Sequence, residues 1–296
     1  MNVTSAGSPP RQALHPDTSV GAVHLTVSDL ARSRYFYERA IGLSSTEGDD
    51  GALTLGVEGE PALLELRADR SAPALNRRAT GLYHLAILVS SRHDLALALR
   101  RLAEARWPLD GASDHLVSEA LYLSDPDGNG IEIYRDRPRE EWRWDGDGNL
   151  QMATLPLDLD GVIGELQGPD DHADRTPAGT RIGHVHLQVA DLAQTEVFYS
   201  GALGFDVVVR GYPGALFVSA GGYHHHIGLN TWHSAGSRPA VPGSIGLRSF
   251  EVVLPSLEEL ERTLQRLTDA GVEFERHDGS ALVRDPSGNG LLLTTR

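Results

Sequence analysis

Residues 125–130 read Asp-Pro-Asp-Gly-Asn-Gly, and a nearly identical stretch, Asp-Pro-Ser-Gly-Asn-Gly, returns 160 positions later at 285–290. Two further pairs of segments are 162 positions apart. Val-Ser-Asp-Leu at 27–30 returns as Val-Ala-Asp-Leu at 189–192, and Phe36-Tyr37 before Ile41-Gly42-Leu43 returns as Phe198-Tyr199 before Leu203-Gly204-Phe205. Similarity at a fixed period is typical of a repeated architecture. The chain is therefore predicted to contain two tandem halves.

Each half divides again into two similar units. Apolar runs at 22–27, 84–89, 184–189 and 249–254 predict four opening strands, and a helical pattern follows each of them. Over 91–106, for example, Leu95, Leu99 and Leu102 share one helix face. Over 29–41, Asp29 is a suitable N-cap and Gly42 a suitable stop. Short β-rich runs then close each unit, so the predicted fold class is α+β, with four βαβββ modules.

The boundaries between these parts are predicted from composition. Residues 1–18 are expected to form a flexible tail, because they contain Pro and Ser and no extended apolar run. Two modules occupy 19–136, and two more occupy 182–296. A segment rich in Asp, Gly and Pro, 137–181, is expected to link them.

Composition and charge narrow the range of functions. The 296 residues include 26 Lys and Arg against 41 Asp and Glu, a net charge of −15, which argues against nucleic-acid and membrane partners. No signal peptide or membrane-spanning run is visible, so we expect a cytoplasmic protein. The sequence contains no Cys, which excludes disulfides, thiolate metal sites and cysteine nucleophiles. Any bound metal ion must use His, Asp, Glu or backbone oxygen.

The "VSDL…FY…LG" pattern and the "DPDGNG-I-E" ending resemble the vicinal oxygen chelate superfamily over residues 20–296. That superfamily includes glyoxalases, fosfomycin-resistance enzymes, bleomycin-binding proteins and type I extradiol dioxygenases. The resemblance implies half-open barrels of paired modules, with metal ligands on the first and last strands. In this chain the first-strand ligand positions fall on Ala22, His84, His184 and Ser249. The last-strand positions fall near Glu65, Glu132, Gly228 and Leu292.

The resemblance therefore implies that His84, Glu132 and His184 bind a metal ion. Two imidazoles and one carboxylate suit Fe(II), with Mn(II) as an alternative. These three residues come from the second and third modules, so we predict that modules two and three pair around the metal ion. The first and fourth modules would then form a metal-free, structural half-barrel.

The segment from His115 to Glu132 closely resembles the extradiol dioxygenase signature. By that resemblance, His115 and Tyr122 would contact the hydroxyl groups of the substrate. Three consecutive histidines, 224–226, resemble the strand that carries the acid/base histidine. The family pattern favours His225, with His226 second, whereas strand alternation from Gly228 would turn His224 and His226 inward. Both interpretations stay open.

Taken together, the motifs resemble bacterial catechol-2,3-dioxygenases. The implied function is metal-dependent extradiol cleavage of a catechol- or hydroquinone-type ring, with a small aromatic diol and O2 as substrates. One alternative is a glyoxalase-like isomerase or thiol-transfer resistance enzyme, which would need a carboxylate base in the cavity. The other is a non-catalytic small-molecule (drug) binding protein. The ring substituents, the cleavage position and a homo-oligomeric state stay open.

Overall fold

The computed structural model describes residues 13–166, 168 and 174–295. Module one comprises β1 (Ser19–Val27), α1 (Leu30–Phe36), β2 (Ser44–Glu47), β3 (Leu53–Gly56) and β4 (Ala62–Ala68). Module two comprises β5 (Gly81–Val89), α2 (Arg92–Glu104), β6 (Gly111–Asp114), β7 (Ser118–Ser124) and β8 (Gly130–Asp136). Module three comprises β10 (Arg181–Gln188), α4 (Leu192–Glu196), β11 (Asp206–Val209), β12 (Ala215–Ser219) and β13 (Ile227–Asn230). Module four comprises β14 (Gly246–Leu254), α5 (Leu257–Asp269), β15 (Phe274–His277), β16 (Ser280–Arg284) and β17 (Gly290–Thr295). The prediction of four βαβββ modules is confirmed.

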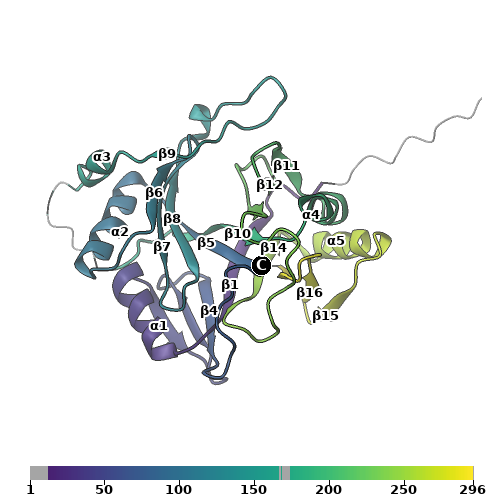
Figure 1. Cartoon of the computed structure of the whole chain (residues 1–296), viewed down its shortest axis with the longest axis horizontal. Coiled ribbons are helices and arrows are strands. Elements are labelled where there is room, and N and C mark those ends of the chain that lie inside the picture. Colours follow the sequence, from purple (N-terminus) through teal and green to yellow (C-terminus); the bar gives the residue numbers. More distant parts are fainter. Residues whose placement is uncertain (1–12, 167, 169–173, 296) are drawn as a thin grey trace, which may run out of the picture.

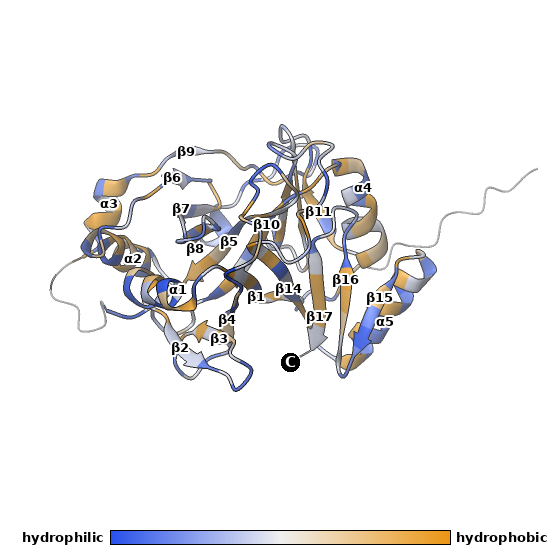
Figure 2. Cartoon of the chain, turned by 60° about the horizontal axis from the view of Figure 1, so that its bottom comes forward, coloured by the Kyte–Doolittle hydropathy of each residue, from blue (hydrophilic) through white to orange (hydrophobic). Residues whose placement is uncertain are grey.

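Local sequence signals explain where the helices begin and end. The Asp29 side chain accepts hydrogen bonds from two amides in the first turn of α1, as an N-cap does. The helix continues as a π-helical segment, Tyr37–Ile41, and ends at Gly42, whose φ of 89° favours glycine. Ser91 and Ser256 cap α2 and α5 in the same way. Figure 2 shows that α5 has one apolar and one polar side.

The four modules form two sheets, and each sheet takes one module from each half of the chain. The nine-stranded sheet runs β11-β12-β13-β10-β5-β8-β7-β6-β9, so modules two and three share it. The eight-stranded sheet runs β15-β16-β17-β14-β1-β4-β3-β2 and joins modules one and four. The predicted pairing of modules two and three is therefore confirmed. Their junction is the antiparallel pair β5–β10, which lies near the middle of the molecule (Figure 1).

Parts of the expected tail and of the expected linker pack against the rest of the fold. Residues 1–12 of the expected flexible tail lie outside the described residues. Leu14, however, is buried, and its amide donates to the Gly204 carbonyl at 2.9 Å. Within the expected linker, β9 (Leu155–Pro156) pairs with β6, and α3 (Leu159–Ile163) follows it. A 3₁₀ turn, Arg139–Glu141, also lies there. Among the described residues no helix is long and apolar enough to cross a membrane.

Candidate metal centre

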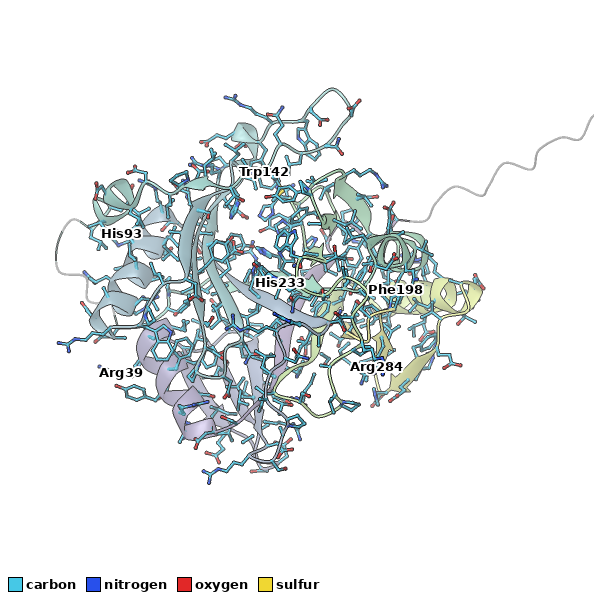
Figure 3. All side chains as sticks on the ribbon, in the orientation of Figure 1. Arg39, His93, Trp142, Phe198, His233 and Arg284 are labelled. Atoms are coloured by element: carbon cyan, nitrogen blue, oxygen red, sulfur yellow. The ribbon has the colours of Figure 1, made fainter. Side chains whose placement is uncertain are left out.

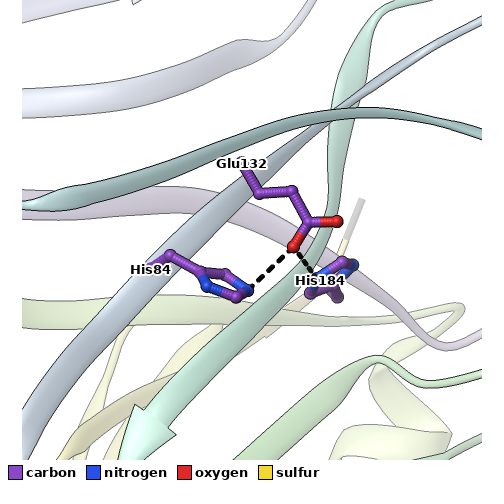
Figure 4. Close-up of side chains that lie close together, drawn as sticks. All are labelled: His84, Glu132 and His184. Atoms are coloured by element: carbon purple, nitrogen blue, oxygen red, sulfur yellow. Dashed lines mark hydrogen bonds and ion pairs between the residues drawn. The ribbon is translucent and has the colours of Figure 1, made fainter. Parts of the chain in front are cut away.

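Three buried side chains converge where modules two and three meet. His84 comes from β5, Glu132 from the parallel neighbour β8, and His184 from β10. His84 Nε2 lies 3.0 Å from Glu132 Oε2, and His184 Nε2 lies 3.3 Å from the same oxygen. Figure 4 shows both rings directed at this carboxylate. All three offer a ligand atom within 4.8 Å of the others. Among the residues that the structure describes, no other group of three His, Asp or Glu meets that test.

The protonation states fit a divalent cation. Burial lowers the pKa of His184 to about 4, so its imidazole is neutral near pH 7. Burial alone would raise the pKa of Glu132, but His184 and His84 together hold it well below its ordinary value. Neutral imidazoles and an ionised carboxylate are the forms that bind metal ions. Separations near 3 Å are also what adjacent ligands would show at roughly 2.1 Å from one ion with right-angle geometry.

The site holds one carboxylate because the last-strand position of module three is occupied by glycine and not by Asp or Glu. Gly228 occupies the last-strand position of module three, and a Cβ there would lie 2.9 Å from the His186 ring. His186 therefore takes the space that a second carboxylate would need. In the sheet of modules one and four, the corresponding positions hold Ala22, Glu65, Ser249 and Leu292, so only Glu65 offers a ligand atom and the two imidazoles have no counterpart.

A cavity of about 460 Å³ opens beside the three residues. His115 and Tyr122, from the extradiol-like segment, both line it. His115 Nδ1 lies 2.7 Å from the Ala153 carbonyl, so this nitrogen carries the proton. His115 Nε2 then accepts from the Tyr122 hydroxyl at 2.7 Å. Burial raises the pKa of Tyr122 well above its ordinary value, and the nearby Glu132 adds to this.

The histidine run places a single ring in this cavity. His225 lines it, and its ring centroid lies 4.1 Å from that of His184. His226 turns away, and its Nδ1 accepts from the Ala220 amide at 3.2 Å. The prediction of an inward His226, and with it the alternation argument, is wrong. Regular strand geometry begins only at Ile227, so alternation does not extend back over these histidines.

His224 links His225 to a carboxylate outside the cavity. His224 Nδ1 lies 2.7 Å from His225 Nδ1, and His224 Nε2 lies 2.9 Å from Asp136 Oδ1. His224 is fully buried, whereas the Asp136 side chain is 26% exposed. Because a carboxylate only accepts, His224 carries a proton on Nε2, and in the neutral ring Nδ1 is then the acceptor. His225 must then carry its proton on Nδ1, which leaves Nε2 unprotonated.

Several residues of the cavity wall were not predicted from the sequence. Aromatic side chains from separate segments, Tyr83, Phe217 and Trp232, surround His186, with ring centroids 5.2 to 5.8 Å away. The expected linker contributes Met152, Ala153 and Thr154. Asp110 is the only carboxylate besides Glu132 among the described lining residues, and it is exposed to solvent. No short motif carries these residues, since they come together only in the folded chain.

Comparison with known proteins agrees with this geometry. The profile of the Glyoxalase/Bleomycin resistance protein/Dioxygenase superfamily matches residues 19–133 and 181–293. The chain belongs to this superfamily. The matched ranges of this superfamily contain all three converging residues, His84, Glu132 and His184.

Individual relatives within the superfamily cover nearly the whole chain. Catechol-2,3-dioxygenase of Bacillus subtilis (strain 168) is 46% identical over 277 residues, which cover 93% of this chain and 96% of the relative. A solved candidate dioxygenase from Bacillus subtilis subsp. subtilis str. 168 has a TM-score of 0.65 at 14% identity, with 96% and 86% of the two chains covered. Glyoxalase I from Zea mays has a TM-score of 0.56 at 15% identity, with 94% and 92% covered. At these identities the two solved structures establish a shared fold alone.

Proposed function

We propose that the protein is a metal-dependent extradiol dioxygenase that cleaves a catechol- or hydroquinone-type ring with O2. The observation that carries this proposal is the buried His84–Glu132–His184 group, beside the cavity that also contains His115 and Tyr122. The 46% identical relative named catechol-2,3-dioxygenase supports it. Fe(II) is the proposed ion and Mn(II) the alternative, because both accept two imidazoles and one carboxylate.

His84, Glu132 and His184 would hold the ion. When bound, the ion would supply a Lewis acid that favours ionisation of a ring hydroxyl and a centre at which the diol and O2 meet. The three protein ligands carry a net charge of −1, because only Glu132 is ionised. They therefore neutralise half of a divalent charge and leave the rest to attract an anionic ring oxygen.

Tyr122 and His115 would orient the diol. The raised pKa keeps the Tyr122 phenol protonated, and its proton is directed at His115 Nε2. The phenol oxygen is then free to accept a hydrogen bond from a substrate hydroxyl. Since His115 is itself held by the Ala153 carbonyl, the donor and acceptor directions are set before the substrate enters.

His225 would take and return a proton. The contacts with His224 and Asp136 leave its Nε2 unprotonated, which is the form that a general base requires. Burial lowers the pKa of His225 well below its ordinary value, so the ring is neutral in the free protein. Asp136 and His224 act through His225, and we assign them as positioning residues.

The test is metal loading followed by turnover. Full-length protein is loaded anaerobically with Fe(II) or Mn(II), its metal content is measured, and catechol is added with air. We expect about one ion per chain and a yellow ring-fission product. His184→Ala and Glu132→Ala should lose both, whereas His24→Ala, a strand histidine in the metal-free sheet, should lose neither. Hemithioacetal isomerisation without ring cleavage would refute the proposal in favour of a glyoxalase-like activity.

A further inference from the structure

A second cavity, of about 970 Å³, lies where the two sheets meet. Its walls include parts of two loops that each connect consecutive modules, residues 69–80 after β4 and 231–245 after β13. The loops are joined, because the Ile245 amide donates to the Pro73 carbonyl at 2.9 Å. Thr80 Oγ1 donates to the Ser287 carbonyl at 2.6 Å and ties the first loop to module four. The cavity wall takes residues from all four modules and from both connecting loops.

The charge of this cavity opposes that of the whole chain. Its described lining contains four arginines, Arg77, Arg78, Arg248 and Arg284, and neither Asp nor Glu. The chain as a whole has 41 acidic residues against 26 basic ones. The charged side chains of this lining are thus all arginines, although acidic residues outnumber basic ones in the chain as a whole.

Three of these arginines have no carboxylate partner among residues 13–166, 168 and 174–295. Arg248 donates to Glu65 at 2.6 Å, and that pair is neutralised. Arg77 and Arg284 donate to the backbone carbonyls of Gly128 and Gly288, at 3.0 and 3.2 Å. Carbonyls orient a guanidinium without cancelling its charge. Arg77, Arg78 and Arg284 are all exposed to solvent, and their guanidinium charges are thus left to attract an anion.

The rest of the wall combines polar and apolar side chains. Leu75, Leu82 and Leu247 line it from three different segments, and Pro239, Val241 and Ile245 complete one side. Val241 is 62% exposed although it is a large apolar side chain. Guanidinium groups bind carboxylates through paired N–H donors, and an apolar wall suits a hydrocarbon or aromatic body.

We propose that this cavity binds a small organic anion, a carboxylate attached to an apolar or aromatic body. The cavity shares Arg77 and Tyr83 with the cavity of the metal centre, and the Tyr83 ring lies 5.4 Å from that of His84. The carboxylate can therefore belong to a separate molecule or to a side chain of the ring substrate. Figure 3 shows Arg284 and His233 of this cavity near the middle of the molecule and Arg39 at its edge.

The test is calorimetric titration of the full-length protein with benzoate, with benzamide as the uncharged analogue. We expect saturable binding of benzoate, at least tenfold weaker binding of benzamide, and at least a tenfold loss of benzoate affinity in the double variant Arg78→Gln/Arg284→Gln. Arg39→Gln, an exposed arginine outside the cavity, should bind benzoate like the natural protein. Glu132→Ala should still bind benzoate saturably. That result would distinguish this site from the metal centre.

Further arms distinguish the two sources of the carboxylate. If the carboxylate belongs to a separate molecule, added benzoate should change the rate at which plain catechol is cleaved. If the carboxylate belongs to a side chain of the ring substrate, the double variant Arg78→Gln/Arg284→Gln should have a raised KM for a carboxylated catechol and an unchanged KM for plain catechol. Absence of saturable benzoate binding, equal binding of benzamide, or unchanged affinity in the double variant would overturn the proposal, whether or not the protein cleaves rings.

Discussion

Replacing Asp136 by alanine should slow turnover without removing the metal ion. Asp136 is the acceptor that sets the proton positions of His224 and, through it, of His225. A hydrogen bond to a charged group contributes about 1.5–3 kcal/mol. If that preference is lost, the equilibrium constant between the two neutral tautomers of His225 shifts by the same free energy. At about 1.4 kcal/mol for each factor of ten, this constant shifts roughly 10- to 150-fold, and kcat should fall by at most that factor.

The assay measures kcat and KM for catechol with protein of verified metal content. The loss should appear in kcat, because no contact of Asp136 with the cavity is seen among the described residues. Asp136→Asn keeps an acceptor oxygen but loses the charge, so it should retain about 1 kcal/mol of the tautomer preference. Its kcat should lie between those of the natural protein and the alanine variant. Nitrogen-15 spectra of the imidazoles in metal-free protein should show the change in His225 tautomer directly.

Two outcomes would refute this reasoning. An Asp136→Ala protein with unchanged kcat would show that the His224 contact does not determine the state of His225. A protein that loses its metal ion together with its activity would assign Asp136 to the stability of the site instead. Asp278→Asn, in the turn between β15 and β16, is the matched control and should leave kcat unchanged.

Three further predictions concern single groups. Burial lowers the pKa of His226 to about 3, so below pH 6.5 the unfolded chain binds a proton at this residue and the folded chain does not. The free energy of unfolding should therefore fall as the pH falls, by about 3 kcal/mol at pH 4.5. Chemical denaturation of His226→Asn should show a free energy of unfolding without this contribution. A Cβ at Gly183 would overlap the Tyr134 hydroxyl, so Gly183→Ala should destabilise by about 1–3 kcal/mol, and adding Tyr134→Phe should recover part of the denaturation midpoint. Tyr122→Phe should lower kcat on the order of 10²-fold with unchanged metal content, and unaltered steady-state kinetics would remove Tyr122 from the mechanism.

Much of the site could be predicted from the sequence because its candidate ligands occupy repeated positions. His84 and His184 occupy matching places on opening strands, and Glu132 follows the Asp-Pro-Asp-Gly turn. The aromatic wall had no such signal. Tyr83, Phe217 and Trp232 are ordinary strand and loop residues in the sequence, and only packing around His186 gives them a shared location.

The orientation of the histidine run shows where local rules fail. Alternation assumes an unbroken strand, but β13 begins at Ile227. The β5–β10 pairing is also irregular, with register shifts on either side of His184–His186. A β-bulge inserts a residue and reverses the side to which later side chains point. Such shifts depend on hydrogen bonds to another strand, so periodicity within one segment cannot reveal them.

Residue patterns alone were enough to define the four βαβββ modules, since caps, apolar periodicity and turns act over a few neighbouring residues. The resemblance to the superfamily then identified the candidate ligands by their place in the repeat. The folded chain decided which imidazole of 224–226 enters the cavity, how the connecting segment closes one wall, and where the four arginines of the second cavity gather between the sheets. These features depend on contacts between residues far apart in the sequence, such as Thr80 and Ser287, which are 207 positions apart, and such a contact leaves no local periodicity to detect.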